Sequence, residues 1–307
     1  IANIFFGAWG VTNIGTNIYV TYRAASLDAS AVREWDAPSN GNWTAGMNWK
    51  DRFAPPAGSP SMRLLFGGGG GDPQYFATND NSGSFMLNRL TFSNANASVT
   101  NVLAGNPLEF WYDNARIEHK GSGGFIVSNA VNMTTNLILS GSGSGTMILS
   151  SNLTGAGSLT KQGTSMAILA GSNSFVGPVL VDGAGGTLVA SNRFAFGTNS
   201  VTVSNGTLFA GIGAATWTNQ NQNLLVTGSG ALWTNSAGFT IDTNVQVTVA
   251  TGGRLVSGSL TVADKGTVKN SLMITNGRQL VSTAASYVGD NTSSNSALVI
   301  GNGSTWT

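Results

Sequence analysis

The 307-residue sequence predicts an all-β protein: a parallel β-solenoid with coils of about 20–26 residues and no substantial helix. Three observations predict it. Apolar and polar residues alternate over short runs, these runs recur at a nearly constant interval, and glycine or Asn–Gly clusters separate them. Alternation with a period of two is typical of a strand with one buried face, and glycine suits tight corners. We expect a right-handed winding, because parallel crossovers are nearly always right-handed.

The repeat is marked by pairs of apolar residues that are separated by one residue. The pairs are Val179/Val181, Val201/Val203, Leu224/Val226, Val247/Val249, Leu272/Ile274 and Leu298/Ile300. They recur at intervals of roughly 22–26 residues, which is typical of one coil in a repeat protein. Such intervals are long for an antiparallel sandwich or barrel, whose strands recur about every 8–12 residues. Asn205–Gly206 and Asn276–Gly277 have the composition of hairpin turns, so the antiparallel fold stays the alternative.

The domain organisation follows the distribution of charge and apolar residues. Residues 1–33 read as an apolar strand segment, in which Ile14, Ile18 and Val20 alternate without an evident partner, so we expect strand addition to a neighbouring subunit. Residues 34–120 are aromatic and charged, and hold irregular first coils or a cap. Residues 121–307 hold the regular solenoid, with 10 of the 27 charged residues against 17 in residues 1–120.

The composition excludes several classes of function. Only 9% of the residues are charged, the net charge is +1 and there is no cysteine. We therefore expect no nucleic-acid partner, no disulfide or thiolate site, no cofactor and, without an 18-residue apolar run, no membrane-spanning segment. Ile1–Trp9 lacks the basic start of a signal peptide, so the chain reads as processed or as cut from a longer one. The neutral Asn/Thr/Ser surface favours a secreted or cell-surface bacterial protein.

Residues 155–209 carry a more specific pattern. It runs through Gly155, Gly157, Leu159, Lys161 and Gly163, then Gly171, Asn173, Phe175 and Gly177, then Val179, Val181, Gly186 and Leu188. This order resembles the autotransporter-associated β-strand repeat, except at Thr164–Ser165–Met166, where that family usually has a second glycine. Trp35–Asp36, Trp43, Trp49 and Phe66 resemble a segment that often precedes this repeat. The ends of Leu224–Thr234 and Ala297–Thr307 resemble a tandem repeat of the same proteins. The resemblance implies a passenger region of a bacterial surface or secreted protein and brings no catalytic residue.

The residues that could take part in catalysis or metal binding also have simpler, structural interpretations. Asp242, Asp264 and Asp290 each follow a short strand at the interval of the repeat, so they would stack as an acidic row or a weak Ca²⁺ ladder, although aspartate is also an ordinary turn residue. His119 is the only histidine, and the charged stretch around it reads as an exposed strand edge. We expect no catalytic residue and no metal site.

These observations support three hypotheses of function. The first is a non-enzymatic structural protein, acting as a rod or as a filament subunit that self-associates by end-to-end stacking or strand addition, with Trp306 at one end. The second is an adhesin passenger that contacts a glycan or a cell surface through Trp35, Trp43 and Trp49; packing or capping is the alternative role for these tryptophans. The third is a polysaccharide lyase or hydrolase that uses the aspartates.

Overall fold

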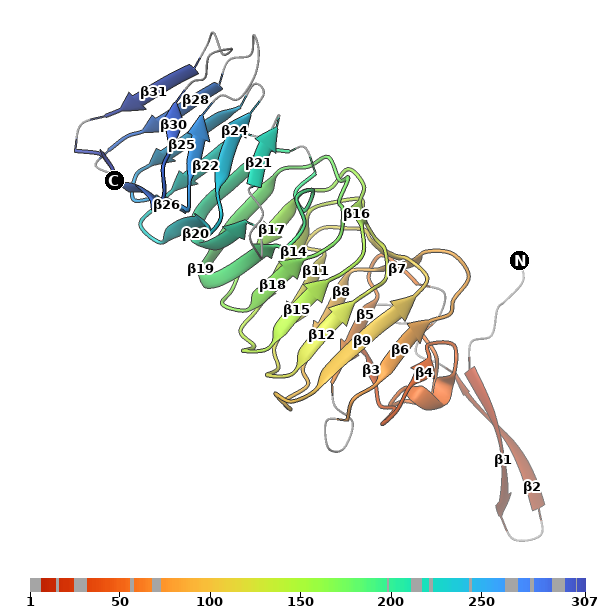
Figure 1. Ribbon diagram of the computed structural model, residues 1–307. Coiled ribbons are helices and arrows are strands. Elements are labelled where there is room, and N and C mark those ends of the chain that lie inside the picture. Colours follow the sequence, from red (N-terminus) through yellow and green to blue (C-terminus); the bar gives the residue numbers. More distant parts are fainter. Residues whose placement is uncertain are drawn as a thin grey trace.

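The chain forms a parallel β-solenoid, as the sequence predicts (Figure 1). The computed structural model describes residues 7–14, 17–24, 32–55, 58–67, 73–197, 199–210, 217–220, 223–242, 245–262, 270–276, 279–288, 296–301 and 303–307. Within these residues the helical content is one 3-10 turn, η1 (Gly46–Asn48). No described helix has the length and apolar character needed to cross a membrane.

Two long ladders of parallel strands form two faces of the solenoid. The first consists of β3 (Val32–Trp35), β5 (Arg63–Phe66), β8 (Arg89–Phe92), β11 (Arg116–His119), β14 (Leu137–Gly141), β17 (Leu159–Lys161), β19 (Val179–Ala190), β20 (Val201–Ala210), β22 (Leu224–Thr227), β25 (Gln246–Ala250), β28 (Asn270–Ile274) and β31 (Ser296–Ile300). The second consists of β4 (Gly41–Asn42), β6 (Phe76–Asn79), β9 (Thr100–Gly105), β12 (Gly124–Val127), β15 (Thr146–Leu149), β18 (Met166–Leu169), the C-terminal parts of β19 and β20, β23 (Ala231–Asn235), β26 (Arg254–Ser257), β29 (Gln279–Ser282) and β32 (Thr305–Trp306).

Shorter strands form the third side in two separate stacks. One stack is β7 (Phe85–Leu87), β10 (Leu108–Phe110), β13 (Val131–Met133) and β16 (Leu153–Thr154); the other is β21 (Trp217–Gln220), β24 (Phe239–Asp242), β27 (Leu260–Val262) and β30 (Tyr287–Val288). All described pairings between coils are parallel, which excludes the antiparallel sandwich. Asn205–Gly206 lies inside β20, where the chain turns from one face to the next, and is not a hairpin turn.

The register confirms the predicted repeat. Val179, Val201, Leu224, Val247, Leu272 and Leu298 are Cα partners on successive rungs. The ladder of strands that carries these residues extends back through β11, β8 and β5 to β3, where Arg116, Arg89, Arg63 and Val32 form a row of Cα partners. The coils therefore begin well before position 121. The first coils are longer than the middle ones. Val32 pairs with Arg63 and Arg63 with Arg89, whereas the later pair Ile138 and Thr160 is clearly closer in sequence.

Residues 1–33 show a different arrangement from the one predicted. β1 (Gly7–Ile14) and β2 (Asn17–Ala24) pair with each other as an antiparallel hairpin, which lies beyond the β3 end of the solenoid (Figure 1). The prediction that this segment lacks a partner of its own was wrong. Val11 pairs with Val20 and Asn13 with Ile18, so each strand already satisfies one edge of the other. Alternation alone does not reveal this pairing.

Buried asparagines connect successive coils at the corners. Asn173 Oδ1 accepts a hydrogen bond from the backbone N–H of Leu153 on the preceding coil (2.8 Å), and its Nδ2 donates to the carbonyl of Ala195 on the following coil (2.6 Å). Asn270 Oδ1 likewise accepts from Val245 N–H (3.0 Å). Each amide supplies a donor and an acceptor that a buried corner otherwise lacks, which explains why a neutral residue recurs at such places.

Gly141 gives a test of the close approach between coils. Its φ is +128°, and a Cβ there would overlap the carbonyl oxygen of His119 on the preceding coil. We expect Gly141→Ala to lower the free energy of unfolding by at least about 2 kcal/mol, from backbone strain and overpacking together. Gly83 also has a positive φ, of +79°, but its Cβ would meet nothing within 4 Å. Gly83→Ala should therefore cost clearly less in the same denaturant titration, and equal costs would contradict the close packing.

Candidate functional site

A row of arginines concentrates positive charge on one line of the described surface. β5, β8 and β11 begin with related tetrapeptides, Arg63–Phe66, Arg89–Phe92 and Arg116–His119, each with arginine first and an apolar residue second. Arg63, Arg89 and Arg116 are Cα partners on adjacent parallel strands. Neighbouring strands are about 4.8 Å apart, so the three guanidinium groups project from one line on the outer face. We call Arg63, Arg89 and Arg116 the arginine ladder.

One carboxylate partly balances this charge. Glu118 Oε2 lies 3.8 Å from Arg89 Nη1 and 3.4 Å from Lys120 Nζ, and Glu118 Oε1 lies 3.6 Å from Arg116 Nη1. Glu118 is largely buried, with 12% of its side chain exposed, whereas Arg89 and Arg116 keep 30% and 25%. Among the described residues Arg63 has no salt-bridge partner, and the buried Nε atoms of Arg63 and Arg89 have no hydrogen-bond acceptor.

Shallow grooves lie on both sides of the arginine ladder. One, of about 440 Å³, is lined by Pro60, Ser61, Arg63, Asn88, Arg89, Tyr112, Asp113, Asn114 and Arg116. The other, of about 330 Å³, is lined by Val32, Arg63, Leu64, Leu65, Arg89, Thr91, Ser93, Glu118 and Lys120. Arg63 and Arg89 line both grooves, so the ladder forms the ridge between them.

The backbone beside the first groove is strained. Tyr112 has a φ of +90° and Asn114 a φ of +58°, a region that residues other than glycine rarely occupy. Tyr112 is 62% exposed and the adjacent Trp111 44% exposed, so two aromatic rings stand on the surface next to the arginines. Strain of this kind costs of order 1–3 kcal/mol per residue and is concentrated at functional sites.

The spacing of the arginines in the sequence indicates this ladder, whereas the overall composition does not. The arginines stand one coil apart each time, at positions 63, 89 and 116, and each begins a strand with the same apolar pattern. A net charge of +1 averages this local cluster away. The net charge of the whole chain therefore gives no information about the charge of this face.

The early tryptophans are not surface residues. Trp35, Trp43 and Trp49 are each at most 1% exposed and pack against one another, with ring centroids 5.3 Å apart for Trp35–Trp49 and 6.1 Å for Trp43–Trp49. Trp49 Nε1 donates to the carbonyl of Trp43 (2.8 Å). The burial confirms the packing role predicted for these tryptophans and excludes an exposed sugar-binding platform, because the wide first coils need large rings to fill the interior.

His119 is also buried, and the prediction of an exposed strand edge was wrong for it. It continues an interior aromatic row, because Trp35, Phe66, Phe92 and His119 are successive Cα partners. Its ring lies 6.4 Å from that of Phe92, and its Nε2 is 2.8 Å from the carbonyl of Gly123. Burial lowers the pKa of His119 from 6.5, which the bond to Gly123 only partly offsets. The imidazole acts here as a packed ring without a nucleophile beside it.

The strands that precede the predicted aspartates stack, but the row of aspartates itself stays a prediction. β24, β27 and β30 stack as successive rungs, with Thr240, Thr261 and Tyr287 in register. The side chain of Asp242, and Asp264 and Asp290 altogether, lie outside the described residues. In the described part of the chain, no three or more histidine or acidic side chains group as metal ligands would.

The remaining predicted assembly residues lie at the two ends of the described chain. Ile14, Ile18 and Val20 belong to the β1–β2 hairpin, whose side chains are outside the described residues. Trp306 in β32 is partly buried and packs against the apolar core of the last coil, with Leu280 as its Cα partner on β29.

Lys161 is the most deeply buried cation of the described chain, and the sequence did not indicate this burial. Its side chain is fully enclosed, and Nζ donates to the carbonyls of Gln162 (2.7 Å) and Gly163 (3.1 Å). Burial lowers the pKa of Lys161 to about 8. No acidic or nucleophilic partner contacts it among the described residues, so we interpret it as a corner residue whose ammonium group serves the backbone carbonyls.

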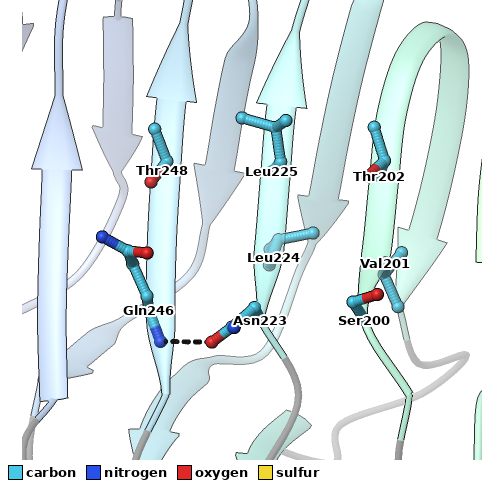
Figure 2. A pocket seen from close by; sticks show the side chains of 8 residues that line it. All are labelled: Ser200, Val201, Thr202, Asn223, Leu224, Leu225, Gln246 and Thr248. Carbon is cyan, nitrogen blue, oxygen red and sulfur yellow. Dashed lines mark hydrogen bonds between the residues drawn. The ribbon is translucent and has the colours of Figure 1, made fainter. Parts of the chain in front are cut away.

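A third groove lies on the same face, over the regular coils, and is neutral. It has a volume of about 230 Å³ and runs over β20, β22 and β25 (Figure 2). Thr202, Leu225 and Thr248 lie side by side in register, and Asn223 Oδ1 accepts from the backbone N–H of Gln246 (2.9 Å). In these rungs uncharged side chains occupy the row that arginines occupy on β5, β8 and β11.

Comparison with protein-family models, with curated proteins and with solved structures finds no match for this chain. The resemblance of residues 155–209 to the autotransporter-associated repeat therefore stays a prediction from the motif. The arginine ladder is therefore interpreted from its geometry alone.

His119 predicts a measurable dependence of stability on pH. The folded imidazole resists protonation, whereas the unfolded one binds a proton below about pH 6.5, so the free energy of unfolding should fall as the pH is lowered through 6.5. His119→Phe continues the aromatic row and should remove this fall. Thermal melts between about pH 5 and pH 8 measure the effect, because this is the only histidine in the chain. Identical pH profiles for the wild type and His119→Phe would contradict it.

Proposed function

We propose that the protein is a structural β-solenoid of the bacterial cell surface or extracellular space, non-enzymatic, that serves as a rod and as a subunit of end-to-end filaments. The observation that carries the proposal is the uninterrupted parallel ladder from β3 to β31. Such a ladder transmits load along the row of backbone hydrogen bonds between coils, and each coil contacts only its neighbours. At about 4.8 Å per rung, the solenoid is a rod on the order of 50 Å long.

The outer surface of the regular coils supports this role. In the row that follows the arginine ladder the outward residues are Thr160, Leu180, Thr202, Leu225, Thr248 and Met273, all of them uncharged. Neutral rows let identical positions stack without repulsion. The motif resemblance of residues 155–209 favours an origin in a large bacterial surface protein.

End-to-end association has a simple structural route. Within the described residues β31 and β32 pair only with β28 and β29, and β3 and β4 pair with β5 and β6. Each terminal rung thus has one edge that lacks a described partner, and a second copy would extend the ladder by pairing there.

Electron microscopy of the purified chain over a concentration series tests the proposal. We expect single rods on the order of 50 Å at low concentration, and rods of two or more units joined along their long axis as concentration rises. Sedimentation velocity on the same samples should show the matching increase in mass. Single rods at every concentration would contradict the filament role, and compact globules would contradict the rod itself.

A further inference from the structure

We propose that the arginine ladder binds an extended acidic polysaccharide, with successive carboxylate or sulfate groups on Arg63, Arg89 and Arg116. This inference does not depend on filament formation, because all its residues lie within one molecule. Its basis is the position of three in-register cations, the grooves beside them and the exposed aromatic rings at their edge.

The first argument is the cost of the ladder to the folded protein. Like charges directly opposite each other on paired strands are destabilising. One rung further along, Ile138 occupies the same row, and the rungs after it carry uncharged side chains. The chain therefore can place neutral residues in this row, yet it places three arginines on three consecutive rungs. A bound polyanion would convert this repulsion into attraction.

The second argument is the supply of unused donors. Glu118 lies 3.4–3.8 Å from its three basic neighbours, so it neutralises charge without accepting a short hydrogen bond from any of them. The Nε atoms of Arg63 and Arg89 are buried without a described acceptor, so a ligand would meet the part of each guanidinium group that stays exposed. A planar guanidinium group is suited to hold a carboxylate or sulfate through two parallel hydrogen bonds. Arg116 Nε already donates to the carbonyl of Asn114 (3.3 Å), which fixes the orientation of the third group. The spacing of about 4.8 Å between rungs is comparable to the length of one sugar ring in an extended chain.

The third argument is the lining of the grooves. Asn88, Asn114 and Thr91 carry amide and hydroxyl groups of the kind that bind sugar hydroxyls. Tyr112 stands 62% exposed, held at a φ of +90°, beside Arg116. An exposed ring offers its flat face to a sugar ring, and the strained backbone keeps the tyrosine in this outward position.

The acidic residues of the site favour a polysaccharide over a nucleic acid. Glu118 and Asp113 line the grooves, where they can accept hydrogen bonds from the many hydroxyl groups of a sugar chain. The whole chain has a net charge of +1 and so lacks the broad basic surface on which nucleic-acid binding depends.

The experiment is a binding titration of the whole chain at low ionic strength, by calorimetry, with four polymers of matched length. Oligogalacturonate tests carboxylates, a heparin fragment tests sulfates, dextran tests a neutral glycan, and single-stranded DNA tests a generic polyanion. The ladder variant is Arg63→Gln/Arg89→Gln/Arg116→Gln. The control variant Lys50→Gln/Arg193→Gln/Arg254→Gln removes the same charge from exposed positions elsewhere.

We expect oligogalacturonate, the heparin fragment or both to bind the wild type, and the stronger of the two identifies the anionic group. Affinity should fall at least about tenfold in the ladder variant and stay within about twofold in the control. Dextran should not bind. Failure of both acidic glycans to bind, an equal loss in the two variants, or DNA binding as tight as that of the glycans would each overturn the inference.

Two single variants separate recognition from folding. Arg89→Lys keeps the charge but loses the two-pronged geometry, so glycan affinity should fall while the melting temperature is kept. Tyr112→Gly removes the ring and relieves the positive φ, so affinity should fall while the melting temperature is maintained or raised. If affinity is unchanged in both variants, the geometry of the arginine fork and the aromatic ring have no role in binding and the inference fails.

Discussion

The structure depends on one constraint: each coil must place its backbone hydrogen-bonding groups directly opposite those of the next coil. Parallel strands paired in register at about 4.8 Å place each residue directly beside the corresponding residue of the next coil. The side chains of adjacent coils must therefore be compatible at every position. Interior rows therefore become ladders of like residues, such as Leu64, Leu90, Ile117 and Leu139, and the corners bring backbone against backbone, as at Gly141 and His119.

The same constraint accounts for the low charge of the regular coils. It also makes the arginine ladder an exception that needs an explanation. A charged residue repeated in register faces its own kind, so long stretches of the outer rows are neutral. On β5, β8 and β11 the chain instead aligns three arginines, of which Arg89 and Arg116 share one carboxylate, that of Glu118. Places where a fold breaks a local rule that it keeps elsewhere are expected to be functional or strained sites, which is the basis for proposing a ligand here. The grooves and the strained Tyr112 lie at this same place.

Much of the fold could be predicted from the sequence, because alternation and period report directly on the ladder. The pairs Val201/Val203, Leu224/Val226 and Val247/Val249 lie in register as their spacing indicated. The arginine ladder could not be found from composition, since it depends on which residues the register of the first coils aligns. The burial of Trp43 and Trp49 agrees with the predicted packing role, whereas the burial of His119 was missed, because the width of the first coils, which decides whether a ring points inward, has no local signature.

The central claim is the register between coils, and engineered disulfides test it most directly because the chain contains no cysteine. In the structure Thr202 and Leu225 are Cα partners with outward side chains, so their separation of about 4.8 Å suits a disulfide. Thr227 lies two positions further along β22, about 8 Å from Thr202 by the rise per strand residue, which is too far. The account predicts that Thr202→Cys/Leu225→Cys forms an intramolecular disulfide under mild oxidation and that Thr202→Cys/Thr227→Cys does not. Preferential cross-linking of the second pair, or none in either, would contradict the in-register solenoid.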